Sequence, residues 1–104
     1  MILEQRDYHV YAGKLPELLR LYESEGIPLQ QEILGGLVGA FTTDIGALST
    51  YTTLWCYDSF AEREEKRARL QADDRWRDFL GRVQPLMHTQ QNRILVPTSF
   101  SPLH

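Results

Sequence analysis

The spacing of hydrophobic residues changes along the chain, and these changes divide it into predicted strands and helices. Residues 2–11 mix apolar positions with regularly placed polar ones, which is typical of a partly exposed β-strand. The apolar residues within 15–22 then recur three and four positions apart, as they do along one face of a helix. We expect this helix to end at Gly26, because a glycine followed closely by Pro28 is a common stop signal.

Two further strands are predicted over Leu34–Thr43 and Leu48–Tyr57, the second of them rich in aromatic and β-branched residues. The short Asp44–Ala47 segment between them contains turn-forming residues, so the two strands should form a hairpin. Large side chains fall on both faces of the second strand. One face carries Tyr51, Thr53, Trp55 and Tyr57, and the other carries Thr52, Leu54 and Cys56.

The second half of the chain predicts a capped helix, a further helical stretch and a final strand. Ser59 and Glu62 have the spacing of a capping box, which marks the start of a helix. An apolar stripe over residues 76–87 predicts the second helical stretch. The last strand is expected over Gln90–Val96, and the tail after it should dock on the domain because it carries two large apolar side chains.

The predicted order of elements, β-α-β-β-α-β, is that of the ferredoxin-like α+β fold. In this fold a four-stranded antiparallel sheet carries both helical regions on one face. A length of 104 residues suits a single domain, 1–104. Because the third strand carries apolar residues on both faces, a single chain would leave one apolar sheet face exposed. We therefore expect a homodimer that packs sheet to sheet.

Composition and charge narrow the range of partners. Hydrophobic residues make up 42% of the chain and charged residues 24%, as in ordinary globular domains. The formal charge of -3 gives no electrostatic reason to expect binding to nucleic acid or to an anionic membrane. The longest apolar stretch, Ile33–Phe41, is too short for a membrane span. No targeting signal is visible, and the single Cys56 fits a reducing interior, so we expect a cytoplasmic protein.

Four parts of the sequence carry a resemblance to a known family. They are residues 36–48, residues 54–59, the pair Arg63 and Arg67 at its spacing, and the closing segment 90–103. Together these parts resemble the NIPSNAP family. The resemblance implies a dimeric α/β-barrel architecture. It leaves the activity open, because the wider superfamily ranges from haem-degrading and cofactor-free monooxygenases to proteins with no known chemistry.

Aromatic and basic residues at inward-facing positions define the candidate site. Arg63 and Arg67 share the helix stripe expected to face the sheet, where they could hold an anion. Alternatively, their stems cover apolar surface and their charged ends lie in water or pair with Glu64. The leading hypothesis is that a small aromatic or anionic molecule binds between sheet and helices, in a pocket lined by Tyr8, Phe41, Trp55, Tyr57, Arg63 and Asn92.

No catalytic, metal or cofactor motif accompanies these residues. His9 has no nucleophile or carboxylate placed beside it by a recognisable motif, and no histidine pair has metal-ligand spacing. Gly35, Gly36 and Gly39 match no phosphate-binding loop and instead predict a bulge or a close backbone approach. We therefore assign no catalytic residue and expect neither a metal ion nor a cofactor.

Two alternatives to simple ligand binding stay open. One is a cofactor-independent monooxygenase, in which the substrate supplies the electrons for oxygen while the protein supplies desolvation and one polar group. The other is a structural or protein-interaction module whose interior is filled by its own side chains. An enclosed pocket of about 300 Å³ or more would favour binding or catalysis, whereas dense packing would favour the interaction module.

Overall fold

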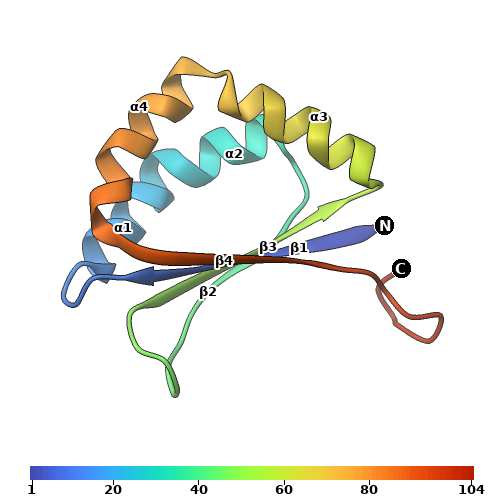
Figure 1. Ribbon diagram of the computed structural model, residues 1–104, viewed down its shortest axis with the longest axis horizontal. Coiled ribbons are helices and arrows are strands. Elements are labelled where there is room, and N and C mark those ends of the chain that lie inside the picture. Colours follow the sequence, from blue (N-terminus) through green and yellow to red (C-terminus); the bar gives the residue numbers. More distant parts are fainter.

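A four-stranded antiparallel sheet carries all of the helices on one of its faces, in a computed structural model that describes residues 1–104 (Figure 1). The strands lie in the order β2-β3-β1-β4. They are β1 (Ile2–Val10), β2 (Leu37–Thr42), β3 (Thr50–Tyr57) and β4 (Met87–Leu95). The helices are α1 (Leu15–Leu21), α2 (Ile27–Ile33), α3 (Phe60–Gln71) and α4 (Asp74–Val83). This arrangement confirms the predicted ferredoxin-like α+β fold and the β2–β3 hairpin.

Side-chain caps fix the start of the two C-terminal helices. The Ser59 hydroxyl accepts a hydrogen bond from the Glu62 backbone N–H at 3.1 Å, as the capping box predicts. The Asp73 carboxylate accepts from the Arg75 backbone N–H at 2.8 Å at the start of α4. These caps satisfy N–H groups that lack a partner within the helix, and they set where α3 begins above the sheet.

The prediction that the first helix ends at Gly26 is wrong. A π-helical turn, Tyr22–Gly26, joins α1 to α2, and the chain stays helical as far as Ile33. Pro28 falls in the first turn of α2, where a missing N–H is tolerated. Gly26 is required by packing, since a Cβ there would lie 2.6 Å from Cζ of Phe79 on α4.

Other element boundaries differ from the predictions by about three residues. Strand β2 begins at Leu37, because α2 occupies the preceding residues and Gly35 and Gly36 then turn with positive φ angles of 61° and 67°. The register of β2 against β3 shifts between Leu37 and Gly39, which confirms the predicted bulge. Strand β4 begins at Met87, immediately after a short 3₁₀ turn that contains Pro85.

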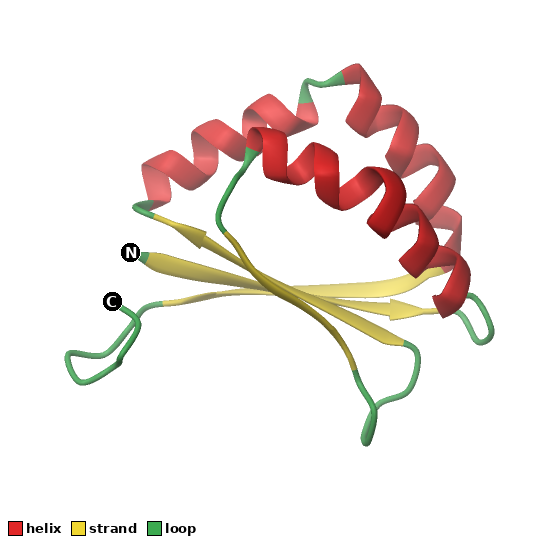
Figure 2. Ribbon diagram, turned by 180° about the vertical axis from the view of Figure 1, so that it is seen from behind, coloured by secondary structure: helices red, strands yellow, loops and turns green.

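The core lies between the sheet and the helices, and the other sheet face is bare (Figure 2). Tyr51, Trp55 and Tyr57 are buried on the helix-facing side of β3, as the alternation predicts. The C-terminal tail does not dock through its largest apolar residue, since Phe100 is 86% exposed. None of the helices is both long enough and apolar enough to cross a membrane.

Replacement by alanine should change the free energy of unfolding in opposite directions at the two helical glycines. Gly26→Ala should lower the free energy of unfolding by about 1–3 kcal/mol, because its Cβ would overlap the rings of Phe79 and Tyr22. Gly81→Ala on α4 should raise it by up to about 1 kcal/mol, since nothing lies within 4 Å of the added Cβ. Urea denaturation of both variants tests this. Equal effects of the two substitutions would contradict the packing role of Gly26.

Candidate functional site

A fully buried carboxylate, that of Glu4 on β1, is surrounded by three arginines beneath the helices. Glu4 Oε2 accepts hydrogen bonds from Arg6 Nη1 at 3.0 Å and from Arg63 Nη2 at 2.8 Å. Arg67 Nη2 lies 3.3 Å from the other oxygen, Glu4 Oε1. We call these four residues the Glu4 cluster. Their charges do not cancel, and two positive charges are left over.

Two elements bring the Glu4 cluster together. Glu4 and Arg6 are two residues apart on β1, so their side chains leave the same face of the sheet. Arg63 and Arg67 are one helical turn apart on α3, so both point down toward that face. The cluster therefore links the middle of the sheet to α3. The partner of both helix arginines is Glu4, not Glu64.

Two tyrosine hydroxyls hold the arginine side chains in place. Arg6 Nε donates to the Tyr8 hydroxyl at 2.7 Å, and Arg67 Nε donates to the Tyr57 hydroxyl at 3.1 Å. Burial raises the pKa of Tyr57, and the nearby charge of Arg67 lowers it less than burial raises it. Tyr57 is therefore a neutral phenol near neutral pH and accepts from the guanidinium as a hydroxyl.

The Glu4 carboxyl is ionised despite its burial. Burial alone raises the pKa of Glu4, but the hydrogen bond from Arg63 and the charges of Arg67 and Arg6 outweigh this effect. The pKa of the carboxyl consequently lies below its ordinary value. A buried carboxylate that is kept charged in this way fixes the positions of the guanidinium groups around it.

A cavity of about 210 Å³ opens beside the cluster, between β1, β4, α3 and α4. It is lined by Arg6, Tyr8, Tyr22, Arg67, Gln71, Trp76, Leu80, Gln84, Met87 and Gln90. The cavity is smaller than the ~300 Å³ that we expect of a small-molecule site from the sequence, so the case for a ligand rests on the charges of its wall and not on its volume. Its two arginines come from the cluster, so one part of its wall is cationic.

The cationic and apolar parts of the cavity wall lie at different positions along the sheet. Arg6 pairs with Asn92 on β4, whereas Met87 pairs with Val10, four residues farther along β1. At about 3.3 Å per residue, this separates the two positions by roughly 13 Å. Met87 therefore lies at the end of the cavity away from Arg6, which we call the apolar end, and Gln84 lines the cavity beside it.

The structure brings five of the six predicted site residues to the helix-facing side of the sheet. Tyr8 lines the cavity. Trp55 and Tyr57 lie beside the cluster but are fully packed, with exposed fractions of 0% and 1%. Arg63 binds Glu4 and does not line the cavity. Asn92 pairs with Arg6 at the β4 edge, where its side chain is exposed.

Phe41, the sixth predicted residue, is not brought together with the others. It pairs with Thr52, whose side chain lies on the bare face of the sheet, and it is 52% exposed. Phe41 lines a separate open groove of about 470 Å³ at the β2 edge. The bulge between Leu37 and Gly39 shifts the alternation of β2 by one residue and so places Phe41 on this face.

Sequence reasoning missed Glu4 and Arg6, although the pattern of β1 contains a signal for them. Ile2, Tyr8 and Val10 are buried, and Glu4 and Arg6 occupy the two intervening positions of the same parity. A carboxylate and a guanidinium on the inward face of a strand need partners there. The two inward arginines predicted on the helix are partners of Glu4, whereas Arg6 is held by Glu4 and the Tyr8 hydroxyl.

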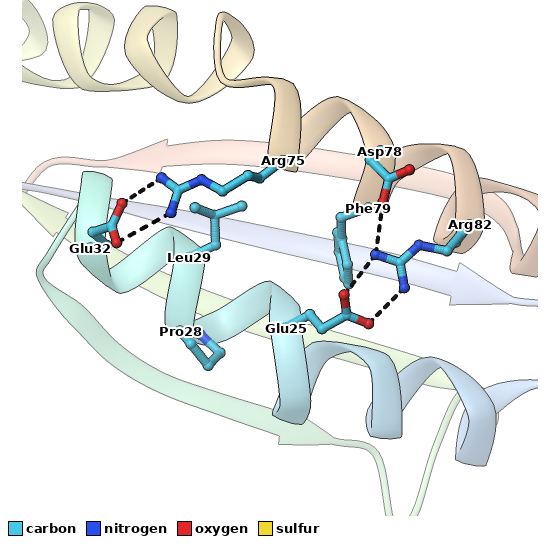
Figure 3. A pocket seen from close by; sticks show the side chains of 8 residues that line it. All are labelled: Glu25, Pro28, Leu29, Glu32, Arg75, Asp78, Phe79 and Arg82. Atoms are coloured by element: carbon cyan, nitrogen blue, oxygen red, sulfur yellow. Dashed lines mark hydrogen bonds and ion pairs between the residues drawn. The ribbon is translucent and has the colours of Figure 1, made fainter.

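A second cleft, between α2 and α4, has a larger volume of about 410 Å³, but its three carboxylates outnumber its two arginines (Figure 3). Arg75 binds Glu32 with its nearest contact at 2.6 Å, and Arg82 binds Glu25 with contacts of 2.6 and 2.7 Å. These exposed ion pairs join the two helices across their surface and contribute little to stability. Both arginines of this cleft are already paired with carboxylates, so the cleft has no unpaired positive charge to offer an anion.

No group of three or more histidine, cysteine, aspartate or glutamate side chains is placed to hold a metal ion. The only cysteine, Cys56, is free and half-buried on the bare face of the sheet. The polar groups that converge in the interior are those of the Glu4 cluster and its tyrosines.

The fold and the cavity together define a class: a ferredoxin-like α+β domain with a small cationic cavity between its sheet and its helices. Comparison with known sequences identifies the group within that class. The NIPSNAP family profile matches residues 3–102, and the chain therefore belongs to the NIPSNAP family. This confirms the family that the sequence resembles.

Individual relatives agree with this assignment. Protein NipSnap homolog 1 of Danio rerio is 31% identical over 102 residues, which cover 98% of this chain but 36% of that protein. The chain thus spans about a third of the length of this relative. A NIPSNAP family protein from Agrobacterium tumefaciens is 47% identical, with a TM-score of 0.96 and coverage of 99% and 98%. A NIPSNAP domain protein from Burkholderia xenovorans is 37% identical, with a TM-score of 0.93 and coverage of 98% and 99%.

More distant structures share the fold alone. An antibiotic biosynthesis monooxygenase has a TM-score of 0.67 over 94% of this chain and 99% of its own, at 10% sequence identity. This likeness supports the ferredoxin-like architecture. At such low identity it carries no information about the reaction.

Replacing the buried carboxylate tests its role in the fold. Glu4→Gln should lower the free energy of unfolding by about 3 kcal/mol near neutral pH, because three partly buried guanidiniums lose their counter-ion. Since the pKa of Glu4 is lowered in the folded state, its contribution is complete above about pH 4.5 and is lost as the pH falls through the folded value. The difference between wild type and variant should therefore shrink in acid.

Urea denaturation at several pH values measures this difference. Glu64→Gln is the matched control, because Glu64 is exposed on α3 and should change stability by less than about 0.5 kcal/mol. A Glu4→Gln variant as stable as the control would contradict the central role of the cluster.

Proposed function

We propose that this protein is a homodimer that binds a small organic or inorganic anion in the cavity beside the Glu4 cluster. The observation that carries the proposal is the charge imbalance of the cluster, in which one carboxylate faces three guanidiniums. Two unbalanced positive charges on partly buried side chains, which are 12% to 27% exposed, favour an anionic ligand. The sequence predicts an aromatic or an anionic ligand, and this charge imbalance supports the anionic one.

The hydrogen-bond pattern of the arginines also supports anion binding. Arg6 uses Nε and Nη1 on Tyr8 and Glu4, which leaves Nη2 without a protein partner. Arg67 uses Nε on Tyr57 and directs Nη2 toward Glu4, which leaves Nη1 without one. Neither of these two nitrogens is fully buried, so both are accessible to solvent. Charged donors of this kind bind anions through strong hydrogen bonds.

The bare sheet face supports the homodimer. Leu3 pairs with Cys56 on one side and with Leu95 on the other, and Leu54 lies on the same face one step along β3. Leu95 and Phe41 on this face are 39% and 52% exposed, so a monomer would leave a patch of apolar surface in water beside the polar Gln5 and Asp7. A second copy of the chain, related by a two-fold axis, would cover the patch on both protomers.

Anion binding is tested by isothermal titration with acetate, sulfate, phosphate and benzoate at low ionic strength. We expect saturable binding of at least one of them, weakened tenfold or more by Arg67→Gln, because this removes a charged donor from the cavity. The matched control is Arg75→Gln, which removes an arginine from the cleft between α2 and α4. The proposal fails if none of the four anions binds, or if both variants bind them as the wild type does.

The dimer is tested by light scattering after size exclusion. The wild type should have twice the 12.1 kDa mass of a single chain. Leu54→Asp should yield folded monomers, because a charge on the bare face would be buried without a partner. Phe60→Asp, at an exposed apolar position on the helix side, should stay dimeric. A monomeric wild type would refute the homodimer.

A further inference from the structure

We infer that the ligand of this cavity is a small organic carboxylate with a compact apolar body, such as a single-ring or branched aliphatic acid. The inference rests on the proposed function and narrows it from anions in general to one chemical class. Three features of the cavity lead to this inference. They are the number of arginine nitrogens without a protein partner, the apolar side chains in the wall, and the volume.

The free donors match a carboxylate. Arg6 and Arg67 each present one accessible terminal nitrogen, because their other nitrogens already bind or face Tyr8, Tyr57 and Glu4. A carboxylate has two oxygens, and each of them can accept a charge-assisted hydrogen bond from one of these two nitrogens. A phosphate or sulfate ion presents more oxygens, which two free terminal nitrogens would leave partly unpaired.

The apolar side chains that line the cavity suit a ligand with an apolar body. Leu80 and Trp76 lie one turn apart on α4 and face the cavity, and Met87 adjoins them from the start of β4. The ring of Tyr22 closes this side from the π-helical turn. An inorganic ion would leave these side chains in contact with water, whereas an apolar group would displace that water.

The volume limits the size of the ligand. A cavity of about 210 Å³ has room for roughly seven water molecules at ~30 Å³ each. One ring or one branched chain with its carboxylate fits this space, whereas a nucleotide or a haem does not. The glutamine amides at the rim, Gln71, Gln84 and Gln90, can hydrogen-bond a polar substituent on the ligand.

The experiment compares benzoate, acetate and inorganic phosphate by isothermal titration with the full chain. We expect benzoate to bind at least about tenfold more tightly than acetate, a difference of ~1.4 kcal/mol, because only benzoate fills the apolar end. Benzoate should also bind more tightly than phosphate. Leu80→Ala should weaken benzoate binding several-fold and leave acetate binding unchanged, since it shortens the apolar wall alone.

Met87→Gln repeats this test without opening a cavity in the core, and circular dichroism establishes that each variant is folded. Phosphate or acetate binding as tightly as benzoate would overturn the carboxylate class while leaving anion binding intact. Equal weakening of benzoate and acetate by Leu80→Ala and Met87→Gln would overturn it as well. Failure of all three anions to bind would instead overturn the proposed function and this inference with it.

Discussion

The ion pairs between Glu4 and its three arginines are the interaction on which the rest of the interior depends. They join the middle of β1 to α3 across the core, where an uncompensated charge would be strongly unfavourable. Because each arginine also bonds a tyrosine or the carboxylate through defined nitrogens, the directions of the guanidiniums are fixed. The same contacts therefore hold α3 on the sheet and leave one terminal nitrogen of Arg6 and one of Arg67, both residues of the cavity wall, without a protein partner.

Charge balance distinguishes this cavity from the larger cleft between α2 and α4. In the cleft every arginine already has a carboxylate partner at the surface, and water screens the pairs. Beside the cavity the cations outnumber the carboxylate, and the side chains of Arg6 and Arg67 are mostly buried. The smaller site is thus the better candidate for a ligand, since an anion bound there would remove an imbalance that the protein itself leaves.

The fold could be predicted from the sequence because the apolar periodicity of its strands and helices is strong. The site could be predicted only in part. The spacing of Arg63 and Arg67 predicts that both face inward from the helix. Their partner, Glu4 on β1, lies 59 residues before Arg63 in the sequence, and no local pattern connects the two. The glycines of β2 predict a bulge but not its exact position, and the bulge between Leu37 and Gly39 turns Phe41 to the bare face. The glycine–proline pattern predicts a helix stop at Gly26, whereas the structure shows that this glycine makes room for the Phe79 ring.

The most direct test of anion binding between sheet and helices is a crystal structure of the protein soaked with a ring-brominated benzoate. Anomalous scattering from bromine would locate the ring independently of the protein atoms. We predict a peak near Trp76 and Leu80, with the carboxylate density on Arg6 and Arg67. A peak only in the cleft between α2 and α4 or on the bare sheet face, or no peak at all, would contradict this account.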